Sequence, residues 1–307
     1  MSEVQLIHKT ALAAKKLAVL LSEFNEGDRV PTIKEMSESL ELARGTTQLA
    51  LNYLQESGAV ILESHGHMGT TLVKIDYPKL LSAQGVQNLV GVMPLPYSKK
   101  YEGFATGLSR NLNSGPFPTY IAFMRGSNNR LKAMLSGRYD FAVMSALAAA
   151  QYMRSKENVR VIRNFGPYSY VGRHVILARE DFDGNFEGIR VGIDESSIDQ
   201  KNLTYSCFRS TNVEYVPLVY TQILVELRDR KIDAAVWNAD DINFALLGLT
   251  SYPLPENAAE SEDDTAAVIV CSADNRLVAR VLQQTLDIQQ VLQIQKQVEQ
   301  EKIIPNY

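Results

Sequence analysis

The sequence has little cysteine, histidine or tryptophan, with two, four and one of them among 307 residues. Cys207 and Cys271 lie far apart, with no CxxC motif and no histidine beside either of them. This pattern argues against a disulfide framework and against a zinc site. We therefore expect two packed thiols in a reducing compartment, with no metal ion and no cofactor.

Neither sign of charge dominates the chain. Its formal net charge is −4, so no overall basic field attracts nucleic acid or anionic lipid, and any DNA contact must come from local geometry. No apolar run reaches membrane-spanning length, and residues 1–17 mix charges through their apolar positions, unlike a signal peptide. We expect a cytoplasmic protein without a membrane partner.

Common catalytic motifs are also missing. The sequence has no nucleophile elbow, no HExxH, no GxGxxG after a strand and no Walker loop. His65 and His67 lack a third metal ligand nearby, and His174 lies in a predicted strand, where we interpret it as a packing residue. We expect a protein that is not an enzyme.

The first quarter of the chain has three helical segments followed by a hairpin pattern. Apolar residues recur at helical spacing over residues 7–24, a second helix is predicted over 33–40, and a third runs from Arg44 to a stop at Gly58. The leucines of this third helix, Leu49, Leu51 and Leu54, are expected to pack inward. Thr32 and Glu35, in the spacing of a capping box, mark the start of the second helix.

Two predicted strands, residues 59–62 and 70–75, surround a turn that contains Gly66 and Gly69. A hairpin that follows three helices predicts a winged helix-turn-helix of the α+β class over residues 1–76.

Four linked motifs cover this region: Gly27-x-x-Val30-Pro31-Thr32-x-x-Glu35-Met36, Arg44-Gly45-Thr46, Leu51-x-x-Leu54-x-x-x-Gly58-Ala59-Val60 and Gly66-x-x-Gly69-Thr70. Together they resemble the winged-helix domain of GntR-type bacterial transcription regulators. The resemblance implies that the third helix enters the major groove of double-stranded DNA and that the wing lies at the minor groove. The DNA-binding residues expected on this basis are Lys34, Arg44, Thr46, Thr47, Gln48, Asn52, His65, Gly66 and His67.

The predicted head is acidic, with seven lysines and arginines against ten carboxylates in residues 1–76. Release of counterions from DNA requires clustered cations at the phosphates. Two alternatives therefore stay open: a head that uses a few well-placed DNA contacts, and a head that only dimerises.

Residues 77–88 are expected to be a linker, and residues 89–307 repeat a strand-then-helix pattern. Within it, residues 131–145 and 224–238 are alike, each with an amphipathic helix, a basic turn and an Asp-x-Ala-Val strand. We expect two β-α-β-α-β lobes, the second at about 185–255, whose strand ends face a shared crevice. A tail helix over residues 277–303 is expected on the first lobe.

This two-lobed pattern resembles the type 2 periplasmic-binding-protein fold. Its attachment to a GntR-like head looks like the bacterial YhfZ-type regulators. The resemblance implies a small-molecule effector held between two α/β lobes.

The crevice is expected to hold a small carboxylate that also carries an amino or hydroxyl group. Serine and asparagine at helix starts, together with Arg125, suit the carboxylate, whereas Asp194 and Glu195 favour an amine. The expected ligand-binding residues are Pro94, Tyr97, Arg125, Ser127, Asn128, Ser145, Asp194, Ser196, Ser197, Tyr220, Thr221, Trp237 and Asn238.

The function favoured by the sequence is a ligand-responsive transcription regulator that acts as a homodimer. One alternative is a cytosolic enzyme or binding protein of the same two-lobed fold whose head only dimerises, since fold alone does not exclude chemistry. A scaffold with neither ligand nor DNA is the other.

Overall fold

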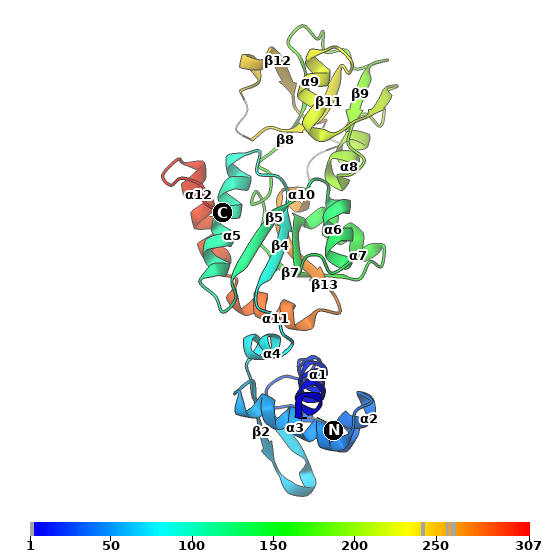
Figure 1. The fold of residues 1–307 in the computed structure, drawn as a ribbon. Coiled ribbons are helices and arrows are strands. Elements are labelled where there is room, and N and C mark those ends of the chain that lie inside the picture. Colours follow the sequence, from blue (N-terminus) through cyan, green and yellow to red (C-terminus); the bar gives the residue numbers. More distant parts are fainter. Residues whose placement is uncertain (1–2, 241–242, 256–257, 259–261) are drawn as a thin grey trace. The chain divides into compact units, whose positions relative to one another are not determined.

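The computed structural model describes residues 3–240, 243–255, 258 and 262–307. The chain forms two compact units (Figure 1). The first comprises Met1–Leu89, Asn113–Pro118 and Ala273–Thr285, and the second comprises Val90–Leu112, Thr119–Ser272 and Leu286–Tyr307. Within the described residues, no helix is both long and apolar enough to cross a membrane.

Three helices form the body of the first unit: α1 (Glu3–Leu21), α2 (Ile33–Ser39) and α3 (Arg44–Glu56). Both α1 and α2 pack against α3. The predicted capping box is confirmed, because Glu35 N–H donates to the Thr32 hydroxyl and Thr32 N–H donates to the Glu35 carboxylate over 2.7 Å.

The core of this unit comes from one side of each helix. Ala13, Leu17 and Leu21 of α1 are buried, as are Ala50, Leu51 and Leu54 of α3. Leu49, which we expected to face inward with Leu51 and Leu54, is 46% exposed. Leu49 is two residues, or about 200° of helical rotation, before Leu51, so it lies on the opposite side of the helix from the buried stripe.

A three-stranded antiparallel sheet of order β1-β3-β2 completes the predicted winged architecture. The hairpin strands are β2 (Val60–Ser64) and β3 (Thr70–Ile75), and β1 (Arg29–Val30) pairs with β3. A single 3-10 turn, η1 (Gly66–Met68), connects the hairpin strands. Gly66 and Gly69 both have positive φ, which explains the glycines at the turn.

The segment expected to be a linker contains a helix, α4 (Tyr77–Ala83), which Asp76 caps. Leu80 and Leu81 are buried on α4, which packs against α1 and against α11 (Arg276–Thr285). The first part of the expected tail helix therefore belongs to the N-terminal unit. Leu80 and Leu81 anchor this short segment, and Pro78 lies in the first turn of α4, where proline is tolerated.

The second unit contains two five-stranded sheets, and the first of them has the order β5-β4-β6-β13-β7. Strands β4 and β6 are parallel, whereas β13 runs antiparallel to both of its neighbours. The strands are β4 (Leu89–Met93), β5 (Thr119–Phe123), β6 (Phe141–Ser145), β7 (Val159–Asn164) and β13 (Ala267–Ser272). The helices of this lobe are α5 (Lys99–Asn113), α6 (Ser127–Leu135), α7 (Ala146–Arg154), α10 (Glu262–Thr265) and α12 (Ile288–Glu299).

The second sheet, of order β10-β9-β11-β8-β12, repeats this arrangement, with β8 as its antiparallel strand. The expected β-α-β-α-β order is present in both lobes. The strands are β8 (His174–Arg179), β9 (Arg190–Ile193), β10 (Glu214–Pro217), β11 (Ala234–Asn238) and β12 (Leu249–Tyr252). Between them lie α8 (Ile198–Cys207), η2 (Tyr220–Gln222), α9 (Ile223–Arg228) and η3 (Phe244–Leu247).

The repeated aspartates have the same structural role in the two lobes. In the first, the Asp140 carboxylate accepts from Val90 N–H over 2.8 Å, and Asp140 N–H donates to Val90 O. In the second, Asp233 makes both bonds with Arg190. Each aspartate thus ties the last strand of its repeat to the first, which accounts for the aspartate at that position in both copies.

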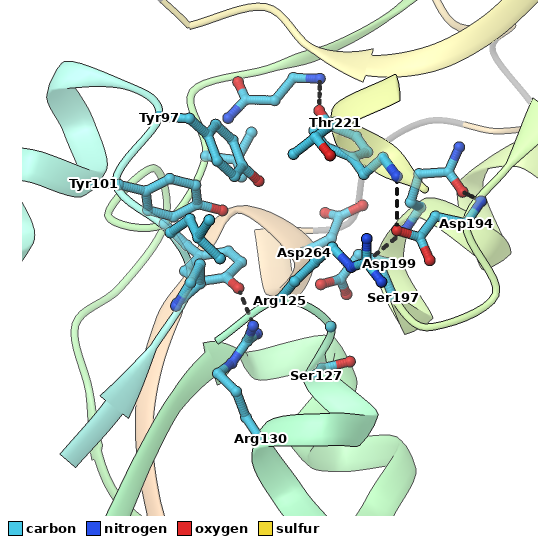
Figure 2. A pocket seen from close by; sticks show the side chains of 18 of the residues that line it. Tyr97, Tyr101, Arg125, Ser127, Arg130, Asp194, Ser197, Asp199, Thr221 and Asp264 are labelled. Carbon is cyan, nitrogen blue, oxygen red and sulfur yellow. Dashed lines mark hydrogen bonds between the residues drawn. The ribbon is translucent and has the colours of Figure 1, made fainter. Parts of the chain in front are cut away.

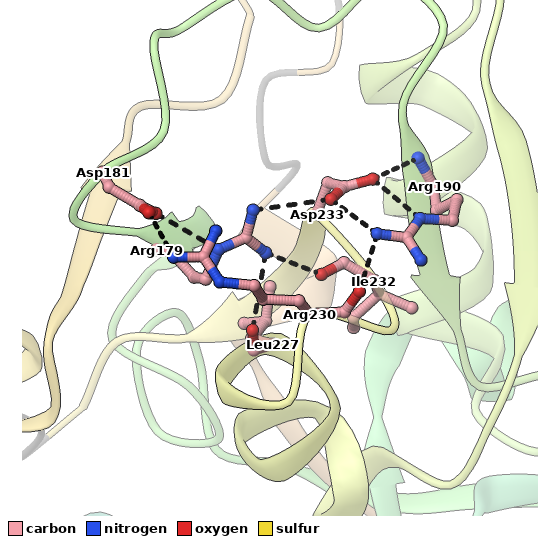
Figure 3. Close-up of polar contacts among 7 residues, drawn as sticks. All are labelled: Arg179, Asp181, Arg190, Leu227, Arg230, Ile232 and Asp233. Atoms are coloured by element: carbon pink, nitrogen blue, oxygen red, sulfur yellow. Dashed lines mark hydrogen bonds and ion pairs between the residues drawn. The ribbon is translucent and has the colours of Figure 1, made fainter.

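Asp233 is also the centre of an ionic network on the second lobe (Figure 3). Arg190 Nη2 lies 3.0 Å and Arg179 Nη2 lies 3.5 Å from Asp233 Oδ1. Partial burial raises the pKa of Asp233, but hydrogen bonds from Arg190 outweigh it and hold the pKa below its usual range. Arg179 also donates to Ile232 O, so the network joins β8, β9 and the turn before β11.

Both cysteines are buried, Cys207 on α8 and Cys271 on β13. Burial raises the pKa of the Cys271 thiol to about 12, which keeps it protonated at physiological pH.

Candidate functional site

The second unit contains a pocket lined by both lobes (Figure 2). Segments that follow β4, β5 and β9 contribute, together with the segment between β7 and β8, the start of η2, the end of β11 and α10. About 700 Å³ of this region is free of protein atoms, part of it open to solvent. The cavity volume itself is about 70 Å³.

One side of the pocket is aromatic. Tyr97 packs edge-on against Tyr101 with ring centroids 5.2 Å apart, and Tyr101 packs in the same way against Tyr170. Tyr220 lies 5.7 Å from Tyr97. Burial raises the pKa values of Tyr101, Tyr170 and Tyr220, so these side chains stay neutral and offer hydroxyl groups that both donate and accept.

Three buried carboxylates also line the pocket: Asp194, Asp199 and Asp264. In the view of Figure 2, Tyr97 and Tyr101 lie on one side, Asp194 and Asp199 on the other, and Asp264 between them. The three carboxylates differ in how far the protein itself already satisfies them.

Asp194 is held by its own turn. Oδ1 accepts from the backbone and hydroxyl of Ser196 over 2.8 and 2.6 Å, and Oδ2 accepts from Tyr220 N–H over 3.0 Å. These bonds occupy both oxygens. Glu195, the other expected acidic contact, is exposed and pairs with Lys201 over 2.9 Å.

The carboxylate of Asp199 receives fewer hydrogen bonds from the protein than that of Asp194. Its Oδ1 accepts from the Ser145 hydroxyl over 2.6 Å, and Oδ2 receives no hydrogen bond from the part of the chain that the structure describes. Burial raises the pKa of Asp199, and Ser145, His174 and Arg130 offset that rise only in part.

Arg130 is the buried cation of the pocket, only 3% exposed. Its guanidinium donates to Val143 O over 3.0 Å, to Met124 O over 2.9 Å and to the Tyr170 hydroxyl over 3.2 Å. These three neutral acceptors fix its orientation and leave its charge uncancelled by direct contact.

Asn238 presents a donor to the same pocket. Its Oδ1 accepts from Asp240 N–H over 2.8 Å, whereas its buried Nδ2 has no hydrogen-bond partner within the described residues. A buried amide donor without a partner is costly, which points to an acceptor supplied from outside the chain.

The structure brings most of the expected ligand-binding residues together. Those that line the pocket are Pro94, Tyr97, Arg125, Ser127, Asp194, Ser197, Tyr220, Thr221 and Asn238. The other four, Asn128, Ser145, Ser196 and Trp237, are not among the lining residues.

Each of these four has a structural role instead. Ser145 caps α7 and bonds to Asp199, and the Ser196 hydroxyl bonds to Asp194. Asn128 accepts from Tyr152 over 2.6 Å, and Trp237 stacks flat against Tyr220 at 4.2 Å.

Ten further residues that line the pocket were not predicted from the sequence: Leu95, Tyr101, Gly126, Arg130, Tyr170, Val171, His174, Asp199, Gln200 and Asp264. His174, which we interpreted as a packing residue, is half-buried at the pocket. Asp199 and Arg130 lie within the first turn of α8 and of α6, near the helix starts that the sequence reasoning had selected. Searching that whole turn for charged residues would have found both.

The second candidate site is the exposed side of α3. Arg44, Gln48 and Asn52 are exposed and four residues apart, so they share one helix face. Gln48 Nε2 donates to Asn52 Oδ1 over 2.8 Å. Thr46 is half-buried, whereas Thr47 is fully buried and bonds to Ala43 O, so Thr47 is removed from the expected surface.

The wing tip and α2 supply the remaining expected DNA contacts. His65, Gly66 and His67 are exposed around η1, and Lys34 is exposed on α2. Within the described residues, no group of three or more histidine, cysteine, aspartate or glutamate side chains could hold a metal ion.

Comparison with known proteins covers nearly the whole chain. Residues 25–72 match a helix-turn-helix domain family, and residues 76–307 match the family of the YhfZ C-terminal domain. A YhfZ protein of Escherichia coli (strain K12) is 35% identical over 302 residues, covering 98% of each chain.

Solved structures extend these similarities. The crystal structure of YhfZ from Shigella flexneri is 35% identical, covers 76% of this chain and 98% of its own, and has a TM-score of 0.62. The periplasmic aliphatic sulphonate binding protein SsuA from Escherichia coli is 15% identical, with a TM-score of 0.51 and coverage of 70% and 73%. The fold is thus a helix-turn-helix domain followed by an α/β domain like the type 2 periplasmic binding proteins.

Proposed function

Because the chain belongs to the YhfZ family and joins a DNA-binding helix-turn-helix domain to a binding-protein-like domain, we propose that it is a ligand-responsive bacterial transcription regulator. The observation that carries this proposal is the pocket, which lies between two lobes of a chain that also has an exposed recognition-type helix. Action on DNA implies work in the cytoplasm.

For the DNA site, we propose a head of the GntR type. Arg44, Gln48 and Asn52 would face the major groove, Thr46 and Lys34 would reach the adjoining backbone, and the wing tip would lie at the minor groove. The few cations of this head support a homodimer, since two heads on one operator double the number of phosphate contacts.

For the effector, we propose a small metabolite with a carboxylate. Arg125 and Ser127 at the start of α6, and Ser197 at the start of α8, all line the pocket. Helix starts and guanidinium groups favour negative charge, so these residues support a carboxylate there.

Selection of binding sequences from a random duplex pool tests the DNA site. The wild type is expected to enrich a palindromic motif, and Arg44→Ala should lower affinity for that motif by about 10- to 100-fold, as for loss of a base contact. Lys79→Ala removes an equal charge from α4 and should retain wild-type affinity. Absence of enrichment would contradict the proposal and favour a head that only dimerises.

The enzyme alternative has one supporting observation, the polar residues gathered in the pocket. Product analysis on any compound that binds separates the two: recovery of the compound unchanged fits a regulator, and conversion fits an enzyme.

A further inference from the structure

The pocket holds more buried negative charge than buried positive charge. Three of its buried side chains are carboxylates, and Arg130 is the one buried cation among the described lining residues. Arg125 lies at the exposed rim. Burial of carboxylates favours a nearby positive charge, so this lining suits a ligand with positive charge in addition to any acidic group.

The carboxylate that most needs a partner is Asp199. Asp199 lines the pocket. Its Oδ1 accepts from the Ser145 hydroxyl, and its Oδ2 accepts no hydrogen bond from the described residues. Asp194 differs, because Ser196 and Tyr220 occupy its two oxygens. Asp199 is thus free to accept from a ligand.

The remaining surroundings suit an ammonium group. Tyr97, Tyr101 and Tyr170 supply ring faces and neutral hydroxyl oxygens, and Asp264 supplies a second buried carboxylate. Cations are stabilised both by aromatic faces and by hydroxyl acceptors.

A second, independent observation concerns a hydrogen-bond donor instead of an acceptor. The Nδ2 of Asn238 is a buried donor in the pocket that lacks a partner within the described part of the chain. It calls for an acceptor atom on the same ligand, such as a carboxylate or hydroxyl oxygen.

We propose that the ligand carries a primary ammonium group, held by Asp199 and Asp264 beside the tyrosines, together with an oxygen acceptor that reaches Asn238. The ligand class is therefore a small amino compound rather than a simple acid. This inference rests on the proposed function, which makes the pocket an effector site.

The test uses thermal unfolding of the full-length protein with a low-molecular-mass extract of bacterial cells. One portion of the extract is left untreated, and in the other the amines are acetylated, which removes their charge and leaves carboxylates in place. The untreated extract is expected to raise the melting temperature, and the acetylated extract is expected to lose that effect. Acid hydrolysis of the acetylated portion regenerates amines and should restore the shift.

Variants connect the effect to the pocket. Asp199→Asn and Asp264→Asn should each abolish the shift, whereas Glu195→Gln, which removes a charge from an exposed residue outside the lining set, should retain it. An equal shift from the acetylated extract would overturn the amine and leave the effector site intact. No shift from either portion would overturn both proposals.

Discussion

Asp199 shows how a single residue can serve binding at the expense of stability. Burial raises the pKa of Asp199, and Ser145, His174 and Arg130 offset this rise only in part. The carboxylates of Asp194 and Asp264 line the same pocket. A carboxylate whose pKa is higher in the folded state than in the unfolded state binds its proton more tightly when folded. Its contribution to stability therefore falls as the pH rises from about 3.8 through the folded-state value.

We predict that Asp199→Asn unfolds at a higher temperature than the wild type near neutral pH, without ligand. The amide still accepts from Ser145 but carries no buried charge. The two melting curves should converge at acidic pH, where Asp199 is protonated. A variant less stable than the wild type at neutral pH would mean that Asp199 serves the fold and not a ligand.

At the scale of elements, two glycines set the spacing between α5 and α12. A Cβ placed on Gly103 would lie 2.7 Å from Gln295 O, and one placed on Gly107 would lie 2.6 Å from Val291 O. These distances are too short for any side chain. The missing side chains let the backbones of the two helices come into direct contact.

We predict that Gly107→Ala destabilises the protein by about 1–3 kcal/mol, as overpacking does elsewhere, although alanine is the better helix former. Chemical denaturation measures this directly. Arg110→Ala, on the exposed side of the same helix, should change stability by no more than about 0.5 kcal/mol. An equally small effect at Gly107 would show that α12 moves aside readily.

For the whole molecule, a regulator must connect its pocket to its head. The connection is a free energy shared by the two sites, so the ligand must change DNA affinity by the same factor by which DNA changes ligand affinity. This equality holds whatever the structural route between the sites.

We predict a factor of roughly 5 to 150 in each direction, once the active compound has been purified from the extract. DNA affinity is measured with and without the compound, and compound affinity with and without operator DNA. Asp199→Asn should bind DNA normally and lose the dependence. Two affinities that are each unaffected by the other ligand would separate the protein's DNA binding from its small-molecule binding and contradict a ligand-responsive regulator.

The sequence by itself determined the elements and their repetition. The capping box at Thr32 and Glu35 is a contact between near neighbours, which short-range patterns record. Asp140 and Asp233 marked the repeat because each makes the same two backbone bonds in its lobe. The helical spacing of apolar residues predicted α1 and α3, because this spacing is also a short-range pattern.

Tertiary structure alone decided which side chains share the pocket. Arg130 and Asp199 are 69 residues apart and Asp199 and Asp264 are 65 apart, and no local pattern marks these residues as partners. Folding also removed Trp237 from the expected lining by stacking it against Tyr220, and it buried Thr47 on the inner side of α3. Exposure and convergence depend on contacts between distant segments, and these form only when the sheets and helices pack.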